Sequence, residues 1–238
     1  MMKKYGESFK HPSIKKFGTR GKFAIWVVDG NYVRTYIDEE FTNYGQHYRF
    51  KFIPQNEFWL DKEANEGEAN YFIDSMLVIN RLMAKGVSHK KAVKVADRVE
   101  RRERHKSKVF KRFVHWVFHS KKVPKEIYKK LLQEFNGIKV WLVDGELVRD
   151  LFYIDFTEGG HDKVYFFIPE KEIWIDDDIS PYERKFVLLH ELHERTLMAK
   201  GIKYGPSHES SSKIEFFCRH HPNKLKKIMK EEIEKIGD

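Results

Sequence analysis

The chain has 238 residues, a formal net charge of +9, 41% hydrophobic residues and 15% aromatic residues. This balance is typical of a globular protein and excludes a disordered chain. No apolar run approaches the roughly twenty residues that a membrane-spanning helix needs, and the single cysteine, Cys218, excludes an internal disulfide.

The N-terminal residues 1–21 form a basic segment without the apolar stretch of a secretory signal. A lone cysteine is typical of proteins in a reducing compartment. We therefore expect a cytoplasmic protein that does not have a membrane as its partner.

The chain contains an internal repeat. Residues 22–100 align with residues 137–215 at a constant offset of 115 positions, and 23 of the 79 aligned pairs are identical. This alignment predicts two homologous units, 22–104 and 137–238, joined by a basic helical connector at 105–136. Such a pseudo-dimer within one chain can replace a homodimer, so we expect an otherwise monomeric protein.

Each repeat begins with signals for β-strands. An apolar run is followed by Asp-Gly and a second run, a pattern typical of a hairpin because a type I′ turn needs positive φ angles. After a glycine-containing break come two further runs rich in aromatic and β-branched residues. We expect three or four antiparallel strands per repeat, at Ile25–Val28, Tyr32–Ile37, Tyr48–Ile53 and Glu57–Leu60 in the first and at Val140–Val143, Leu147–Ile154, Val164–Ile168 and Glu172–Ile175 in the second.

The second half of each repeat has apolar residues at helical spacing. A glycine ends the first helix of each repeat, and a second helix follows. The predicted helices are Glu68–Lys85 and Ser88 to beyond Arg104 in the first repeat, Tyr182–Lys200, Pro206–Arg219 and Asn223–Ile236 in the second, and Pro124–Phe135 between them. Strands followed by helices predict the α+β class, with each unit a small antiparallel sheet followed by two or more helices.

Positive charge is concentrated between the repeats. Residues 98–130 contain thirteen Lys and Arg against three Glu, a local balance of +10. Clustered cations displace counterions from a polyanion, so nucleic acid is one expected partner. The candidate contact residues are Lys111, Arg112, Lys121 and Lys122. The commoner alternative is a solvated helix face without a ligand.

Only the second repeat carries metal-ligand chemistry, in the sequence His-Glu-Leu-His-Glu at residues 190–194. On a helix, His190 and Glu194 share one face, and Glu191 is rotated from them by about 100°. His208 stands near the start of the next predicted helix. Two histidines and one carboxylate are the usual protein ligands of a catalytic Zn²⁺ ion. We therefore predict that His190, Glu194 and His208 bind zinc or another divalent metal, with Glu191 as a general base towards water.

The string His190-Glu191-x-x-Glu194 resembles the HExxH helix of the zincin metallopeptidases, with glutamate in place of the second histidine. The resemblance covers fewer than thirty residues, and its third ligand lies eighteen residues after the first, unlike the best-known zincins. It implies a peptide substrate, with His190, Glu194 and His208 as ligands and Glu191 as the catalytic base. The repeated module as a whole resembles an uncharacterised prokaryotic or viral module, which implies no function.

The first repeat differs at these positions. His190, Glu191, His193, Glu194 and His208 align with Ser75, Met76, Val78, Ile79 and Val93. Solvated positions would more naturally change to other polar residues, so this replacement predicts that the site faces inward, where unpaired charge is costly. The alternative is that the His-Glu residues are an ordinary polar helix face.

Several other polar residues are candidates for a role at the site. His193 is an alternative metal ligand, although a supporting or surface role is expected. His161, in a Gly-Gly-His-Asp loop, is expected to be solvated. Arg149 and Glu215 also occur in the first repeat, as Arg34 and Glu100, and are therefore expected to be structural pairs or caps.

Three classes of function fit the sequence. The first is a metal-dependent hydrolase, peptidase-like, with its site in the second repeat and a degenerate first repeat. The second is a nucleic-acid-binding protein that uses the basic residues 98–130. The third is a non-catalytic interaction module whose repeat doubles a binding surface. The metal content of the purified protein separates the first class from the other two.

Overall fold

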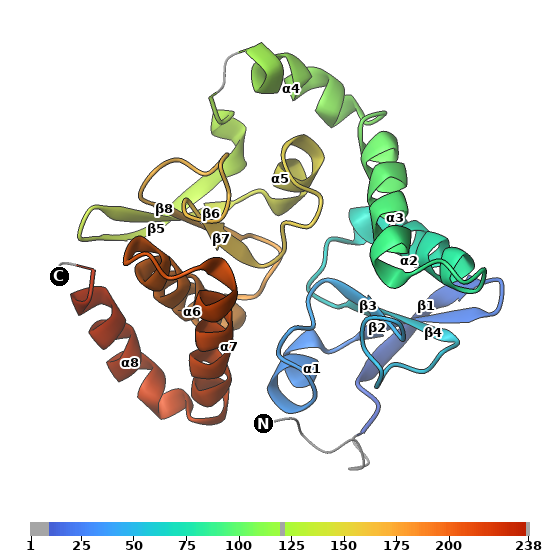
Figure 1. Ribbon diagram of the computed structural model, residues 1–238, viewed down its shortest axis with the longest axis horizontal. Helices are drawn as coiled ribbons and strands as arrows, with labels where there is room; N and C mark the ends of the chain where they lie inside the picture. The colour runs from blue at the N-terminus through green and yellow to red at the C-terminus, as the bar shows by residue number, and fades with distance from the viewer. Residues whose placement is uncertain (1–9, 120–121, 237–238) are drawn as a thin grey trace. The chain divides into compact units, whose positions relative to one another are not determined.

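The computed structural model describes residues 10–119 and 122–236 and divides into two compact units, residues 1–104 and residues 105–238. Each unit contains one four-stranded sheet with helices (Figure 1). The α+β class and the tandem organisation are therefore confirmed. No helix in the described ranges has the length and apolar character needed to cross a membrane.

The first unit has a sheet in the order β1-β2-β4-β3. A short helix connects β2 to β3, and two longer helices follow the sheet. The elements are β1 Ser13–Arg20, β2 Phe23–Val28, α1 Gly30–Tyr36, β3 Tyr44–Gln46, β4 Glu57–Asp61, η1 Glu66–Glu68, α2 Ala69–Met83 and α3 His89–Arg104.

The second unit has the same order of strands, β5-β6-β8-β7. Its elements are α4 Lys108–His119, η2 Lys125–Ile127, β5 Tyr128–Phe135, β6 Ile138–Val143, α5 Gly145–Leu151, β7 Gly159–His161, β8 Glu172–Asp176, α6 Pro181–Ala199, α7 Tyr204–His220 and α8 Pro222–Glu234. Alternate residues of β8 point to opposite faces of the sheet. Ile173 and Ile175 pack with α6, whereas Trp174 packs on the other face with residues of α5.

Both sheets are mixed, which corrects the prediction of antiparallel sheets. The central strands β2 and β4 run parallel, as do β6 and β8, while the outer pairs are antiparallel. A parallel pair needs a crossover connection. In each unit that connection consists of the short helix, the short third strand and the loops on either side of this strand.

The predicted Asp-Gly hairpins are wrong. The Asp29 carboxylate accepts a hydrogen bond from the backbone N–H of Tyr32, and Asp144 does the same for Leu147, so each aspartate caps a helix, α1 or α5. The hairpin lies upstream of the predicted position. In the second unit it joins β5 to β6 through Asn136 and Gly137, whose φ angles of 49° and 74° suit an Asn-Gly turn.

Two other predictions of local structure are also wrong. The apolar runs at 48–53 and 164–168 are turns rather than strands, because their apolar side chains anchor a loop to the core instead of extending a ladder. The predicted helix Pro124–Phe135 is the short 3-10 helix η2 followed by strand β5.

The units begin earlier than the aligned repeat predicts. Strand β1 lies within the predicted N-terminal segment 1–21, and strand β5 lies within the predicted connector 105–136. Helix α4 also belongs to the second unit, because Phe110 and Phe113 are buried in a core cluster with residues of α5. The connector is thus largely part of a folded unit.

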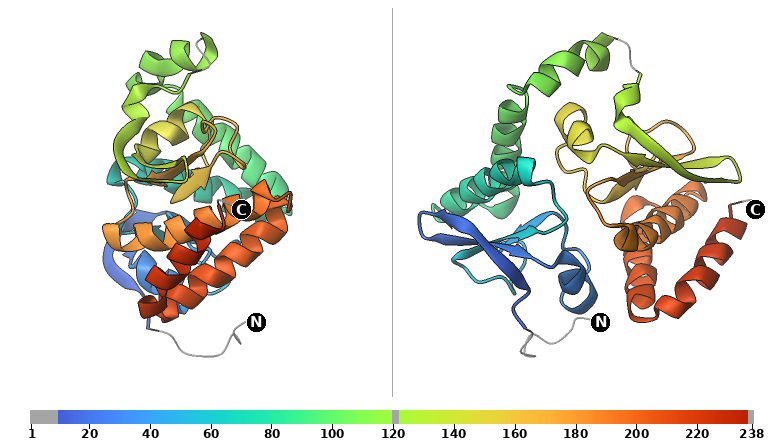
Figure 2. Two further views of the ribbon diagram at one scale, coloured as in Figure 1. Left: turned by 90° about the vertical axis from the view of Figure 1, so that its left-hand side faces the viewer. Right: turned by 180° about the vertical axis from the view of Figure 1, so that it is seen from behind.

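Helices α2, α6, α7 and α8 agree with the predictions from spacing, whereas the helix predicted to continue past Arg104 ends there as α3, and a separate helix, α4, begins at Lys108. Helix α6 begins at Pro181, where the Ser180 side chain accepts from the backbone N–H of Glu183, and Gly201, with a φ of 86°, follows its end. Helices α6, α7 and α8 lie side by side (Figure 2). Leu225 of α8 packs with Phe186 and Leu189 of α6 and with Cys218 of α7, which holds the three helices together.

Candidate metal centre

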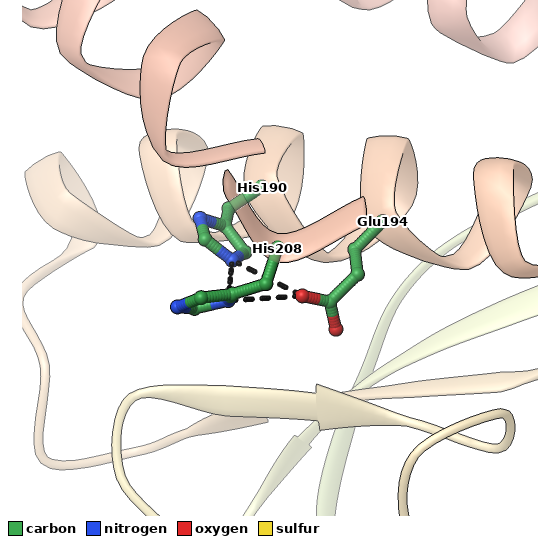
Figure 3. Close-up of side chains that lie close together, drawn as sticks. All are labelled: His190, Glu194 and His208. Carbon is green, nitrogen blue, oxygen red and sulfur yellow. Dashed lines mark hydrogen bonds and ion pairs between the residues drawn. The ribbon is translucent and has the colours of Figure 1, made fainter. Parts of the chain in front are cut away.

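Helices α6 and α7 bring the three predicted ligands together (Figure 3). The Nε2 atom of His190 lies 3.1 Å from Nδ1 of His208 and 3.7 Å from Oε2 of Glu194. The last pair, His208 Nδ1 and Glu194 Oε2, is 2.9 Å apart. The predicted convergence of two imidazoles and a carboxylate is present.

This arrangement fits a small divalent cation. Ligand atoms at the bond lengths of tetrahedral zinc lie about 3.3 Å from one another, and the three measured separations bracket that value. The His208 side chain is 33% exposed, against 12% for His190 and 4% for Glu194. The group is therefore buried on the α6 side and open on the His208 side, where a substrate could approach.

The orientation of His190 is set by Glu215 on α7. The Nδ1 atom of His190 donates to Glu215 Oε2 at 2.9 Å, so in the neutral ring it is Nε2 that has the lone pair for an ion. Burial acts to lower the pKa of His190, but hydrogen bonds with Glu194 and Glu215 outweigh it and hold the pKa well above its usual value. An ion would have to displace a proton from this ring.

Glu215 is itself held by a buried ion-pair network. The guanidinium of Arg219 donates to Glu215 and also pairs with Glu183. Burial acts to raise the pKa of Glu215, but the hydrogen bond to His190 and the charge of Arg219 keep it well below its usual range. The carboxylate is thus ionised and aimed at His190.

The first unit contains the same network at the aligned positions. Arg104 donates to Glu100 and Glu68, and Ser75 occupies the position of His190 and donates to Glu100 at 2.6 Å. The network is therefore part of the scaffold. The expectation that Glu215 is merely structural needs correction, because in the second unit it contacts a candidate ligand.

Arg149 fits the structural expectation. Arg149 is a residue of α5 and pairs with Asp176, the last residue of β8, and with Asp178. Asp177, between them, pairs with Lys129. Each of the three adjacent aspartates thus pairs with Arg149 or Lys129, so we interpret them as an ion-pair cluster of the scaffold, although their oxygens lie within 4.8 Å of one another.

Glu191 is buried beside strand β7 rather than among the three ligands. One of its carboxylate oxygens lies within 4.8 Å of donor atoms of His161 and Glu194. Burial raises the pKa of the Glu191 carboxyl, and the neighbouring histidines oppose that rise. A carboxylate with a raised pKa is suited to accept and return a proton near neutral pH.

Two residues beside Glu191 have environments that their local sequence does not indicate. His161 is fully buried and contacts Glu194, which corrects the expectation of a solvated loop residue. Tyr165 has a pKa raised by burial and then by the charge of Glu191, so its hydroxyl lies in the electrostatic range of that carboxylate. Its aligned residue in the first repeat is Phe50, which lacks the hydroxyl, and this difference is the one sequence signal that could have pointed to Tyr165.

His193 is not placed as a ligand, which corrects that alternative. Its Nδ1 atom lies 2.8 Å from Glu232 Oε2 on α8, and its Nε2 atom lies 2.9 Å from Ser210 Oγ on α7. Both ring nitrogens therefore form contacts that link α6 to α7 and α8, in agreement with the expected supporting role.

The candidate nucleic-acid contacts are distributed over α4 and the segment after it. Lys111 and Arg112 are exposed on α4, next to the buried Phe110 and Phe113. Lys122 is exposed after the helix, and Lys121 lies outside the described residues. Only the first two can therefore be placed on a defined helix face.

No protein-family model, curated protein or solved structure matches this chain. The internal repeat provides a comparison within the chain. Ser75, Met76 and Ile79, which align with His190, Glu191 and Glu194, are all buried in the first unit. The predicted inward orientation is confirmed at these three positions, whereas Val78 and Val93, the other two aligned positions, are only partly buried. At the three buried positions the second unit has His and Glu where the first has Ser, Met and Ile.

Proposed function

We propose that the protein is a metal-dependent hydrolase of peptide or amide bonds, with its active site in the second unit and a degenerate first unit. The observation that carries this proposal is the approach of His190 Nε2, Glu194 Oε2 and His208 Nδ1 to within 2.9–3.7 Å of one another. Three protein ligands leave a fourth position for water or substrate, as in catalytic zinc sites. Another divalent metal that accepts nitrogen and oxygen ligands is the alternative to zinc.

A divalent ion at this position would polarise a carbonyl group and make water more acidic. Glu191 accepts the proton that the attacking water loses while the water oxygen bonds to the carbonyl carbon. The same carboxyl returns the proton to the amide nitrogen when the carbon–nitrogen bond breaks. Glu215 keeps His190 in the tautomer that leaves Nε2 free for the ion.

The proposal is tested by elemental analysis of protein that was never exposed to a chelator. We expect close to one zinc, or another divalent ion, per chain, and loss of that ion in His190→Ala. The matched control is Ser75→Ala, the aligned position of the first unit, which should leave the metal content unchanged. A wild-type chain without metal would remove the hydrolase proposal.

A second variant separates binding from catalysis. Glu191→Gln keeps the shape of the side chain but cannot accept the proton, and Glu191 is outside the set of three ligands. We expect the variant to keep its ion while losing peptide hydrolysis. Loss of the ion instead would make Glu191 a ligand and would contradict its role as a base.

Nucleic-acid binding is the second candidate function, favoured by the exposed cations of α3 and α4. Those of α3 are Lys90, Lys91, Lys94, Arg98, Arg101 and Arg102. Neutralising Lys111, Arg112, Lys121 and Lys122 together should flatten the dependence of log affinity on log salt concentration, by a slope of about 0.9 for each phosphate that these cations neutralise. Neutralising Lys224 and Lys226, which are exposed on α8, is the control. Absent or salt-insensitive binding would discard this candidate.

A further inference from the structure

His161 has an environment that its loop sequence does not indicate. It is fully buried at the end of β7, facing helix α6. Its Nε2 atom lies 3.1 Å from Oε1 of Glu194, the oxygen that does not face His208. Its Nδ1 atom lies 3.1 Å from the backbone nitrogen of Lys163.

Two roles are compatible with that position. His161, Glu191 and Glu194 have donor atoms within 4.8 Å of one another and could hold a second ion, bridged to the first by Glu194. Alternatively, His161 could donate a hydrogen bond to Glu194 and leave a single metal position. The two roles require different tautomers of the ring.

The hydrogen bond from Lys163 decides the tautomer. A backbone N–H can only donate, so Nδ1 of His161 accepts and carries no proton. The neutral ring then carries its proton on Nε2. An Nε2–H group donates to Glu194 Oε1 and has no lone pair to offer to an ion.

We propose that His161 is a positioning residue for the metal centre and not a ligand. Its Nε2–H group holds Oε1 of Glu194, so Oε2 is the one oxygen presented beside His190 and His208. The centre therefore takes one ion per chain. This inference rests on the proposed metal-dependent function, and it assigns the fully buried loop histidine a part in that function.

The backbone around His161 keeps it at this distance. A Cβ atom at Gly159 would lie 2.9 Å from Val187 Cγ1 and 3.2 Å from Glu191 Cγ, so α6 packs directly on the backbone of β7. Asp162, the next residue after His161, forms a two-bond ion pair with Arg195, the next residue after Glu194. His161 and Glu194 are thus held together by contacts on both sides.

The first unit supplies a matched substitution. Gln46 stands at the position of His161, and its amide can donate a hydrogen bond where the imidazole does. His161→Gln therefore preserves the donor, whereas His161→Leu removes it with similar volume. Gln46→Leu makes the corresponding change in the unit without the ligands and controls for general effects on folding.

The experiment measures Zn²⁺ affinity of the full chain by competition with a chelator, and Co²⁺ binding by visible absorption. We expect one ion per wild-type chain, an affinity in His161→Gln close to wild type, and a loss of about 10–100-fold in His161→Leu. The Co²⁺ spectrum of His161→Leu should also change, because Glu194 is no longer fixed. Gln46→Leu should bind both ions as the wild type does.

Three outcomes would overturn the inference. One is two ions per wild-type chain falling to one in both His161 variants, which would make His161 a ligand. Another is an unchanged affinity in His161→Leu. The third is an equal loss in His161→Gln and His161→Leu, because the amide can donate the same bond.

A separate measurement does not depend on metal binding or on the variants. The ¹⁵N shifts of the imidazole in the metal-free wild-type chain report which ring nitrogen of His161 is protonated. A neutral ring with its proton on Nε2 supports the hydrogen bond from His161 Nε2 to Glu194 Oε1. A proton on Nδ1 instead overturns the proposal that His161 donates this bond. A wild-type chain that binds neither Zn²⁺ nor Co²⁺ would instead remove the proposed function, and the two failures are thus distinguishable.

Discussion

One residue distinguishes two otherwise equivalent buried networks. In the second unit Glu183, Arg219 and Glu215 support His190, and in the first unit the aligned Glu68, Arg104 and Glu100 support Ser75. A buried carboxylate needs a charged or hydrogen-bonding neighbour, which the arginine supplies in both units. In both units a carboxylate oxygen thus contacts the side chain at position 75 or 190, and only in the second unit is that side chain a histidine, the candidate metal ligand.

This comparison gives a prediction for Glu215→Gln. The amide cannot fix the His190 tautomer as a carboxylate does, so Zn²⁺ affinity should fall by about 10–100-fold. Glu100→Gln removes the same carboxylate from the first unit and is the matched control. Both variants should lose stability by about 1–3 kcal/mol, but only Glu215→Gln should lose zinc affinity in a chelator competition. Equal affinities in the two variants would show that Glu215 does not support the ion.

The convergence of the candidate ligands could be predicted from the sequence, whereas the residues that contact them could not. His190 and Glu194 are four residues apart on one helix, so their shared face follows from helical geometry. Glu215 is 25 residues from His190, and His161 is 33 residues from Glu194. Contacts at such separations depend on how α7 and β7 pack against α6, which local spacing does not encode.

At the scale of elements, the same limit explains the errors in the strands. The Asp-Gly pairs follow a strand and are typical of hairpin turns, but aspartate before a glycine is also a good helix cap. The short helices α1 and α5 form because the cap is followed by apolar residues that pack on the sheet. Helices α2, α6, α7 and α8 agree with prediction because their apolar spacing continues over more than three turns.

The close packing of α6 on β7 can be tested at Gly159. An added methyl group would lie 2.9 Å from Val187 and 3.1 Å from the backbone oxygen of Trp174, so Gly159→Ala forces the strand and helix apart. We expect a loss of about 1–3 kcal/mol in the free energy of unfolding and a weaker Zn²⁺ affinity. Gly18→Ala, where nothing lies within 4 Å of the added atom, is the control and should keep its zinc affinity. An unchanged affinity in Gly159→Ala would contradict the role of this contact in placing Glu194.

The docking of α8 should depend on pH through Glu232. Burial acts to raise the pKa of Glu232, but hydrogen bonds from His193 and Lys235 outweigh it and hold the pKa below its usual value, which is about 4.3. Because the folded pKa is the lower one, the stabilisation is present above about pH 4.3 and is lost as the pH falls through the folded value.

Glu232→Gln should therefore unfold at lower denaturant concentration than the wild type at pH 6, by about 1–3 kcal/mol. The difference should shrink as the pH falls below about 4. Glu231→Gln is the control on the same helix, because the Glu231 side chain is about half exposed and its ion pair with Lys227 is long at 3.7 Å. That variant should differ from the wild type by less than about 1 kcal/mol. A pH-independent effect of Glu232→Gln would contradict the charge-based docking.

At the scale of the whole molecule, the repeat is complete in the sheet but unequal in the helices. Helix α8 follows α7 and packs on α6 of its own unit. Helix α4 follows α3 at the corresponding place in the chain, yet its buried Phe110 and Phe113 belong to a cluster of the second unit. The second unit thus contains every candidate metal ligand, the residues that contact those ligands, and helix α4, which follows the first repeat in the chain.

This division predicts that metal binding belongs to the second unit alone. A fragment of residues 105–238 should fold and bind one Zn²⁺ with an affinity within about threefold of the full chain, because His161, Glu183, Glu215 and Arg219 all lie within it. A fragment of residues 1–104 should fold around its own Glu68–Arg104 pair and bind no zinc. Circular dichroism checks the folding of each fragment, and chelator competition measures its zinc affinity. A folded 105–238 fragment without zinc affinity would mean that the first unit contributes to the site, and the interpretation of that unit as degenerate would be wrong.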